Sequence, residues 1–261
     1  DGKAVASWSA LMVSALALGH QVLGELRYRR AAERAAAFLL TGMTRDGILH
    51  HICPDGPRRV PGFLDDYAFA VHAFLDLYET TLDFSRALTA RELADTMLNL
   101  FWDGAAGAFC LTSDAHAHLI ARPKPAFDAA EPSGNAMAAL GLLRLGRLME
   151  ERPLLETAHR VLETFQPMME RAPRGFLTML CAVDFDLGPA QEVALVGPPD
   201  GPAMQALVRA LHRCYAPGKI VAHVDPDTAD AAERIRRIPW LASKGLVSGR
   251  AAAYVCRDYV C

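Results

Sequence analysis

Two carboxylate-bearing motifs in this chain have the residue types that acid/base chemistry needs. Asp66 lies in Phe63-Leu64-Asp65-Asp66-Tyr67, and Glu131 begins Glu131-Pro132-Ser133-Gly134-Asn135. A pair of carboxyl groups with different pKa values can act as general acid and general base, as in glycoside hydrolysis. We therefore take Asp66 and Glu131 as the candidate catalytic residues.

Side chains near these two carboxylates could hold a hydroxyl-rich ligand. Aromatic faces stack on sugar rings, and short polar side chains bind hydroxyl groups. Simpler structural roles remain open, because Asp and Ser are good helix N-caps and buried aromatic residues often only fill a core. If Asp65 caps a helix, Asp66 points elsewhere and faces the site. The candidate substrate-binding residues are Trp8, Asp65, Tyr67, Ser133 and Asn135.

These motifs recur at the starts of predicted helices. Trp8 and Asp65 are 57 residues apart, and so are Asp46-Gly47 and Asp103-Gly104, which mark turns. Apolar spacing predicts a pair of helices in each repeat, separated by a short break. The predicted helices are two within 7–44 that break at Gly24-Glu25, then 65–81, 85–101, 135–149 and 153–165, with a further helix over 176–185.

Three helical hairpins of similar length predict a repeat array or a toroid, with a simple helical bundle as the alternative. A single hairpin cannot bury its own apolar face, so three of them look like part of a ring. If the first helices form the inner wall, their N-termini gather at one end. A polar cup lined by free backbone N–H groups would result, which suits a hydroxyl-rich or anionic ligand.

The pattern changes near residue 188. Strands are predicted over 192–197, 219–224 and 252–255, with helices over 203–215 and 228–237 between them. This order predicts a small α/β appendix over 188–261, packed on a helical part over 1–187. The stretch after the first strand matches neither a dinucleotide-binding nor a phosphate-loop pattern, so we expect no nucleotide and no cofactor.

Composition excludes several classes of protein. Hydrophobic residues make up 52% and charged residues 22%, and the net charge is −3, which argues against disorder and against nucleic-acid binding. No apolar run reaches about 18 residues, so we expect no membrane partner. The histidines at 50–51, 116 and 118 lack a supporting cluster, so we expect no metal. The six cysteines, of which Cys181 and Cys214 have apolar neighbours, are expected as reduced thiols in the cytoplasm.

The motifs also carry a family resemblance that spans the chain in order. The matching stretches are 1–12, Phe63–Phe69, Trp102-Asp103 with Gly107 and Phe109, Glu131–Asn135, and 253–261. Together they resemble the C-terminal portion of the YyaL-type thioredoxin-domain-containing proteins, called the spermatogenesis-associated protein 20 family in animals. The chain differs from the usual family pattern at Ser9-Ala10 and at Ala129-Ala130.

The resemblance implies a longer parent protein. Its N-terminal domain would be thioredoxin-like, and the rest would form an (α/α)6 toroid of the six-hairpin glycosidase and N-acylglucosamine 2-epimerase type. The implied fold class is mainly α, a partial (α/α)6 toroid with a small C-terminal α/β appendix. Two functions follow as hypotheses: a sugar-type ligand site with epimerase- or hydrolase-like chemistry, or a non-catalytic scaffold that serves the thioredoxin-like domain.

Overall fold

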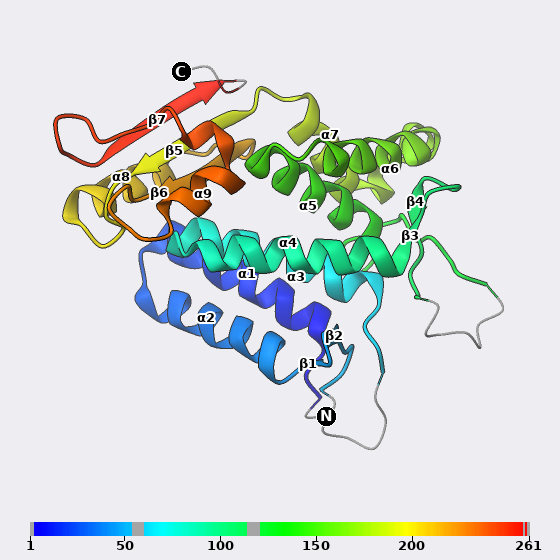
Figure 1. The fold of residues 1–261 in the computed structure, drawn as a ribbon. Coiled ribbons are helices and arrows are strands. Elements are labelled where there is room, and N and C mark those ends of the chain that lie inside the picture. Colours follow the sequence, from blue (N-terminus) through cyan, green and yellow to red (C-terminus); the bar gives the residue numbers. More distant parts are fainter. Residues whose placement is uncertain (1–2, 54–59, 114–120, 258, 260–261) are drawn as a thin grey trace.

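The helices form consecutive antiparallel hairpins (Figure 1). The computed structural model describes residues 3–53, 60–113, 121–257 and 259. Short linkers join the helices of each hairpin, and Gly24, Leu82 and Glu150 end the first helices in the left-handed conformation. The hairpins are α1 (Ala6–Leu23) with α2 (Leu26–Thr41), α3 (Leu64–Thr81) with α4 (Phe84–Phe101), and α5 (Gly134–Met149) with α6 (Arg152–Arg171), followed by α7 (Leu177–Leu187).

The predicted turns form short β-hairpins after the first two helical pairs. The strands β1 (Thr44–Arg45) and β2 (Ile48–Leu49) pair across Asp46-Gly47, where both residues have positive φ. Glycine suits such a turn because it has no Cβ. The strands β3 (Trp102–Asp103) and β4 (Ala108–Phe109) pair in the same place one repeat later.

One helix is longer than predicted. The sequence predicted an end at Phe165, but α6 continues through Pro167 to Arg171. Proline removes one backbone N–H donor and usually ends or kinks a helix. Here Phe165 and Met169 are buried on either side of Pro167, so packing of this face outweighs the lost hydrogen bond.

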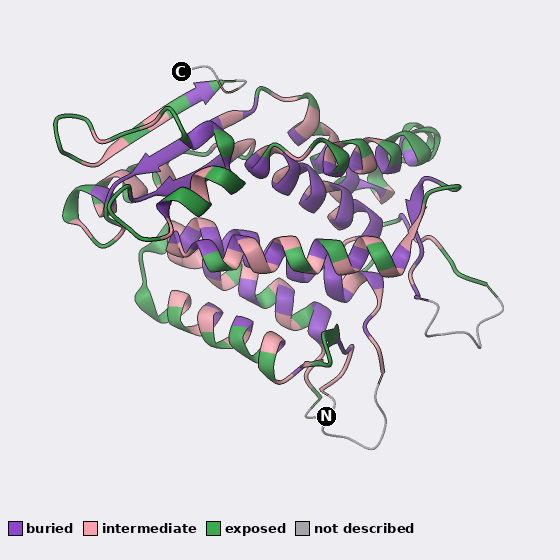
Figure 2. Ribbon diagram, in the orientation of Figure 1, coloured by how far each residue is buried: buried purple, intermediate pink, exposed green. Residues whose placement is uncertain are grey.

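The first helices of the hairpins form a row in which α1 packs on α3, α3 on α5, and α5 on α7. The second helices α2, α4 and α6 each pack on the preceding helix. Nearly every residue of α3 is buried, because neighbours contact it on several sides. Figure 2 shows the same contrast between the largely buried α5 and the outward face of α6. The arrangement is that of part of an (α/α) toroid.

The end of this row exposes an apolar stripe on α1. Trp8, Met12, Leu18 and Val22 are all exposed and lie within one side of the helix. By length and composition alone, α1 would be long and apolar enough to cross a membrane, but the core helices of soluble proteins pass the same test. The stripe is the kind of surface that a further helix of a ring would cover.

The second part of the chain is a small sheet with helices. Its strands are β5 (Gln191–Val196), β6 (Lys219–Val224) and β7 (Ala252–Arg257), in the order β6-β5-β7. β5 and β6 are parallel and joined through α8 (Pro202–Arg213), whereas β7 is antiparallel to β5. The short helix α9 (Ala231–Arg237) follows β6. The predicted strand–helix–strand order is therefore confirmed, while the domain division at 187/188 stays a prediction.

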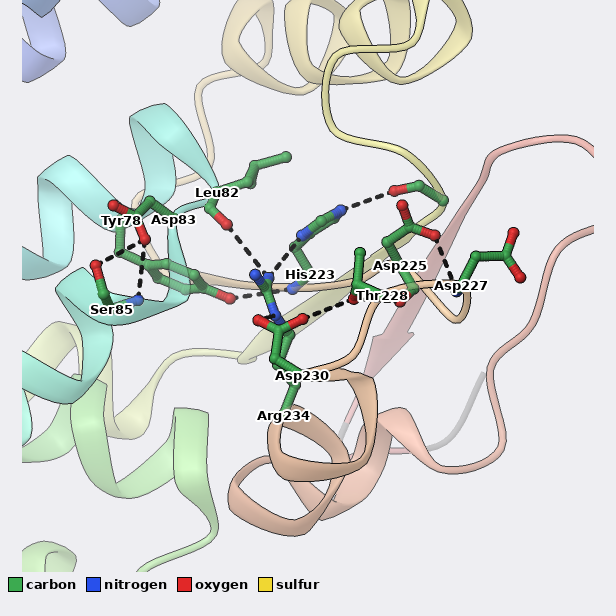
Figure 3. Close-up of polar contacts among 11 residues, drawn as sticks. Tyr78, Leu82, Asp83, Ser85, His223, Asp225, Asp227, Thr228, Asp230 and Arg234 are labelled. Carbon is green, nitrogen blue, oxygen red and sulfur yellow. Dashed lines mark hydrogen bonds and ion pairs between the residues drawn. The ribbon is translucent and has the colours of Figure 1, made fainter.

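Specific hydrogen bonds hold the sheet against the helices (Figure 3). The backbone N–H of His223 on β6 donates to the hydroxyl of Tyr78 on α3 at 3.0 Å. The guanidinium of Arg234 on α9 donates to the carbonyl of Leu82, where α3 ends. Further along, the indole N–H of Trp240 donates to the carbonyl of Leu148 on α5. The sheet is thus fixed to the C-terminal ends of the first helices.

The cysteines differ in part from expectation. The apolar neighbours of Cys181 and Cys214 in the sequence indicated buried thiols, but both are exposed, on α7 and after α8. Their thiols are free, as is that of Cys110. Cys256 on β7 is disulfide-bonded, which corrects the expectation that every thiol is reduced.

A buried ionic network joins α3 to α5. The guanidinium of Arg144 contacts the carboxylates of Asp76 and Glu79 at 2.7 and 2.9 Å. It also donates to Nδ1 of His72, whose Nε2 donates to the carbonyl of Met137. Burial lowers the pKa of His72 to about 4, so the ring is neutral and can accept from Arg144.

We predict that Arg144→Met destabilises the fold by about 3–5 kcal/mol, because two buried carboxylates lose their partner. Urea unfolding monitored by circular dichroism measures the effect. Arg152→Met is the matched control, since Arg152 and its partner Glu156 are largely exposed and such pairs contribute under about 1 kcal/mol. Equal effects of both substitutions would contradict this role for Arg144.

Candidate functional site

The N-terminal ends of the first helices meet, as the repeat predicted, and carboxylates link them. Oδ1 of Asp66 on α3 accepts from the backbone N–H of Ser7 on α1 at 2.9 Å. Farther along the row, Asp128 accepts from the N–H of Ser133 before α5 and from the N–H of Thr178 on α7, at 2.9 and 2.7 Å. Each carboxylate therefore satisfies donors that helix ends leave open.

Asp66 has a structural role that the sequence assigned to its neighbour. It is completely buried, and its Oδ2 accepts from the N–H of Phe63 at 2.8 Å, which caps its own helix. Its carboxylate also accepts from Nδ1 of His51 at 3.0 Å. The expectation that Asp65 caps α3 while Asp66 faces the site is thus reversed.

Asp65 is the carboxylate with the unusual environment. Its Oδ1 is buried and has no hydrogen-bond partner among the described residues. Burial, with the nearby charges of Asp66 and Glu131, raises the pKa of Asp65 to about 6, although His51 and the N–H of Gly134 oppose the shift. A carboxyl group with such a pKa exchanges its proton near neutral pH, which suits an acid/base role.

Glu131 and His51 complete the cluster. Oε2 of Glu131 is buried and has no hydrogen-bond partner within the described part of the chain. The pKa of His51 is raised, first by its hydrogen bond to Asp66 and then by the charges of Asp66, Glu131 and Asp65, against the effect of burial. We call Asp65, Asp66, Glu131 and His51 the carboxylate cluster.

The other predicted binding residues divide into exposed and structural ones. Trp8 is 63% exposed at the start of α1 and is free to stack on a ligand. Tyr67 is buried and its hydroxyl accepts from the N–H of Leu49. Ser133 is the predicted N-cap of α5, where it accepts from the N–H of Ala136. Asn135 is fully buried and ties α5 to β4 through the N–H and carbonyl of Phe109.

Sequence reasoning missed two members of this region. His51 was considered only as a metal ligand, yet it pairs with a carboxylate distant in sequence. Asp128, which directly precedes Ala129-Ala130, was not a candidate at all, although it joins two helix N-termini. No set of three or more metal-ligating side chains comes together in residues that the structure describes, and His116 and His118 lie outside them.

Comparison with solved structures supports the fold class. Over 63% of its length the chain resembles cellobiose 2-epimerase from Bacillus thermoamylovorans (TM-score 0.51, 14% identity, 45% of that chain). Over 64% it resembles the GH76 alpha-mannanase BT2949 of Bacteroides thetaiotaomicron (TM-score 0.55, 14% identity, 45% of that chain). At such identities the likeness shows the fold alone: part of an (α/α)6 toroid, as predicted.

Comparison of sequences confirms the resemblance to spermatogenesis-associated protein 20. The whole chain aligns with the human protein of that name at 32% identity and with an uncharacterized protein of Caenorhabditis elegans at 25%. No family model matches the chain. The chain spans about a third of the length of the curated relatives it matches, 34% for the human protein.

We predict that Asp66→Ala destabilises the protein by about 3–5 kcal/mol, because the N–H groups of Ser7 and Phe63 and the ring of His51 lose a buried acceptor. Chemical unfolding measures the loss. Asp184→Ala, at an exposed position of α7, should change stability by no more than about 0.5 kcal/mol. A mild effect at Asp66 would contradict its linking role.

We predict that Asp65→Asn stabilises the protein at pH 7.5 but not near pH 4. The folded-state pKa of Asp65 is raised to about 6, so the folded state binds the proton more tightly than the unfolded state. Ionisation therefore costs stability as the pH rises from about 4 to about 6, up to roughly 3 kcal/mol. Urea unfolding of both proteins across this range gives the difference, and a difference independent of pH would contradict the shift.

Proposed function

We propose that the carboxylate cluster is one part of an acid/base site for a carbohydrate-type ligand. The observation that carries the proposal is the environment of Asp65. The pKa of Asp65 is raised, its Oδ1 has no hydrogen-bond partner in the described part of the chain, and it is near enough to feel the charge of Glu131, whose Oε2 also lacks a partner there. A carboxyl group whose pKa is raised can act as a general acid, and a second carboxylate beside it can act as the base.

In this proposal Asp65 donates a proton to a ligand oxygen and Glu131 accepts one. Asp66 is a positioning residue, because its hydrogen bonds fix the start of α3 and the ring of His51. Trp8 supplies an exposed aromatic face on the adjacent helix. The proposed site therefore consists of Asp65, Glu131 and Trp8. Asp66 positions the site in this proposal, instead of having the catalytic role predicted from the sequence.

The names of the structural neighbours support a sugar as the ligand. One is a cellobiose epimerase and the other a mannanase, and both share this part of the toroid with the chain. Their reactions differ, and a shared fold does not transfer chemistry. The carboxyl pair itself is compatible with hydrolysis or with proton transfer at a sugar carbon.

The test uses the full-length protein, because the chain covers only part of its relatives. A screen of neutral and acidic oligosaccharides for turnover identifies a substrate. Asp65→Asn and Glu131→Gln should each lower kcat by about 10²–10⁴-fold while the melting temperature stays equal or rises. Glu156→Gln, at an exposed position of α6, is the control. Full activity in both cluster variants would overturn the proposal.

A second candidate function is a non-catalytic scaffold that binds a thioredoxin-like domain of the same protein. The apolar stripe of α1 favours it, because exposed residues such as Met12 and Val22 need a protein surface to cover them. The pair Met12→Glu and Val22→Glu would then release a separately expressed partner domain in a binding assay. If the protein is only an enzyme that uses the carboxylate cluster, these two substitutions would affect ligand binding only indirectly, by disturbing how α1 packs against the next helix of the ring.

A further inference from the structure

A polar cleft lies at the opposite end of the first helices from the carboxylate cluster. It has a volume of about 230 Å³ and is formed by the C-terminal ends of α1 and α3, the start of α2, the loop after β5, and α8. Ser7, which contacts Asp66, and Gln21, which lines the cleft, are 14 residues apart on α1, so about 21 Å of helix separates the cluster from the cleft. The two regions are therefore separate.

The position of the cleft is one where ligands bind in α/β folds. Pro199 and Asp200 line it and belong to the loop that follows β5. The loop begins at the carboxyl end of β5, and because β6 runs parallel to β5, the carboxyl end of β6 lies at the same edge of the sheet. Open α/β sheets bind small molecules in the crevice outside the carboxyl ends of such strands.

His212, on α8, lines this cleft and carries a ring nitrogen without a hydrogen-bond partner among the described residues. Burial lowers the pKa of His212 to about 4, so the ring is neutral at pH 7. The ring donates to the backbone carbonyl of Glu79, while Nε2 is buried with no partner among the described residues. A hydroxyl group can both donate and accept, so it can satisfy Nε2 in either tautomer of the neutral ring.

Two amides add acceptors. The side-chain nitrogen of Gln21 donates to the hydroxyl of Thr80, and that of Gln205 donates to the carbonyl of Pro199. These bonds fix which end of each amide is the nitrogen, so both carbonyl oxygens remain to accept. The carboxylate of Asp200 accepts in the same way. The complementary molecule is rich in donors, as a polyol is.

The charged groups of the cleft favour one anionic group on that molecule. Arg209 is exposed at the cleft and has no ion-pair partner in the described part of the chain. Arg29, the other guanidinium, is held by Glu33 at 2.9 Å. A free guanidinium binds a phosphate or a carboxylate through two parallel hydrogen bonds.

We propose that this cleft binds a small polyhydroxylated anion, its hydroxyl groups on Nε2 of His212 and the two glutamine carbonyls and its anionic group on Arg209. A sugar phosphate and a sugar acid share this chemistry. The proposal is independent of the function proposed for the carboxylate cluster.

The test measures thermal stability and calorimetric binding of the full-length protein with glucose 6-phosphate, gluconate, glucose and inorganic phosphate. At least one of the first two should raise the melting temperature, and which one does so identifies the anionic group. Arg209→Ala should weaken its binding by about tenfold or more. Arg213→Ala, one turn farther along α8 and also exposed, is the matched control and should bind normally.

His212→Leu separates binding from folding. It removes a buried polar atom without a partner, so the unliganded protein should melt at the same or a higher temperature while the ligand-induced shift disappears. The double variant Asp65→Asn with Glu131→Gln should keep the shift, since those residues lie at the other site. The proposal is overturned if no probe binds, if phosphate alone binds as well as glucose 6-phosphate, or if binding survives both Arg209→Ala and His212→Leu.

Discussion

The structure depends on carboxylates that satisfy the N-terminal ends of neighbouring helices. Asp66 accepts from α1 and from the start of its own helix, and Asp128 does the same for α5 and α7. Helix N-termini carry open donors and a partial positive charge, so a buried carboxylate there is stabilised where it would otherwise be costly. This interaction brings the helix starts together and sets the register of the row.

The same arrangement concentrates negative charge at one end of the row. Asp66 takes the N–H groups of Ser7 and Phe63, whereas Oδ1 of Asp65 and Oε2 of Glu131 are buried without a hydrogen-bond partner among the described residues. The pKa of Asp65 rises because burial and two nearby carboxylates disfavour its charged form. The carboxylate that links the helices therefore also raises the pKa of its neighbour Asp65, which is a condition for acid/base chemistry.

The opposite end of the row follows a different physical rule. There the helices end in carbonyl groups, and the small sheet is fixed to them by Tyr78, Arg234 and Trp240. The contact of α8 with these helix ends leaves a polar cleft. Two glutamine side chains offer carbonyl oxygens there, and Arg209 offers a guanidinium. The two ends of the helical row therefore differ in the chemistry that they offer.

Local sequence patterns were enough to predict the hairpin repeat, the turns at Asp46-Gly47 and Asp103-Gly104, and the succession of strands and helices after residue 188, because these follow from periodicity and turn chemistry. The role of Asp66 as a link between α1 and α3 became visible only in the folded chain, because Asp66 reaches Ser7, 59 residues away. The same holds for His51, for Asn135, which is a packing residue, and for α6, which passes Pro167 because buried contacts outweigh one hydrogen bond. Interactions between distant residues fix these roles, and spacing along the chain does not encode distance in space.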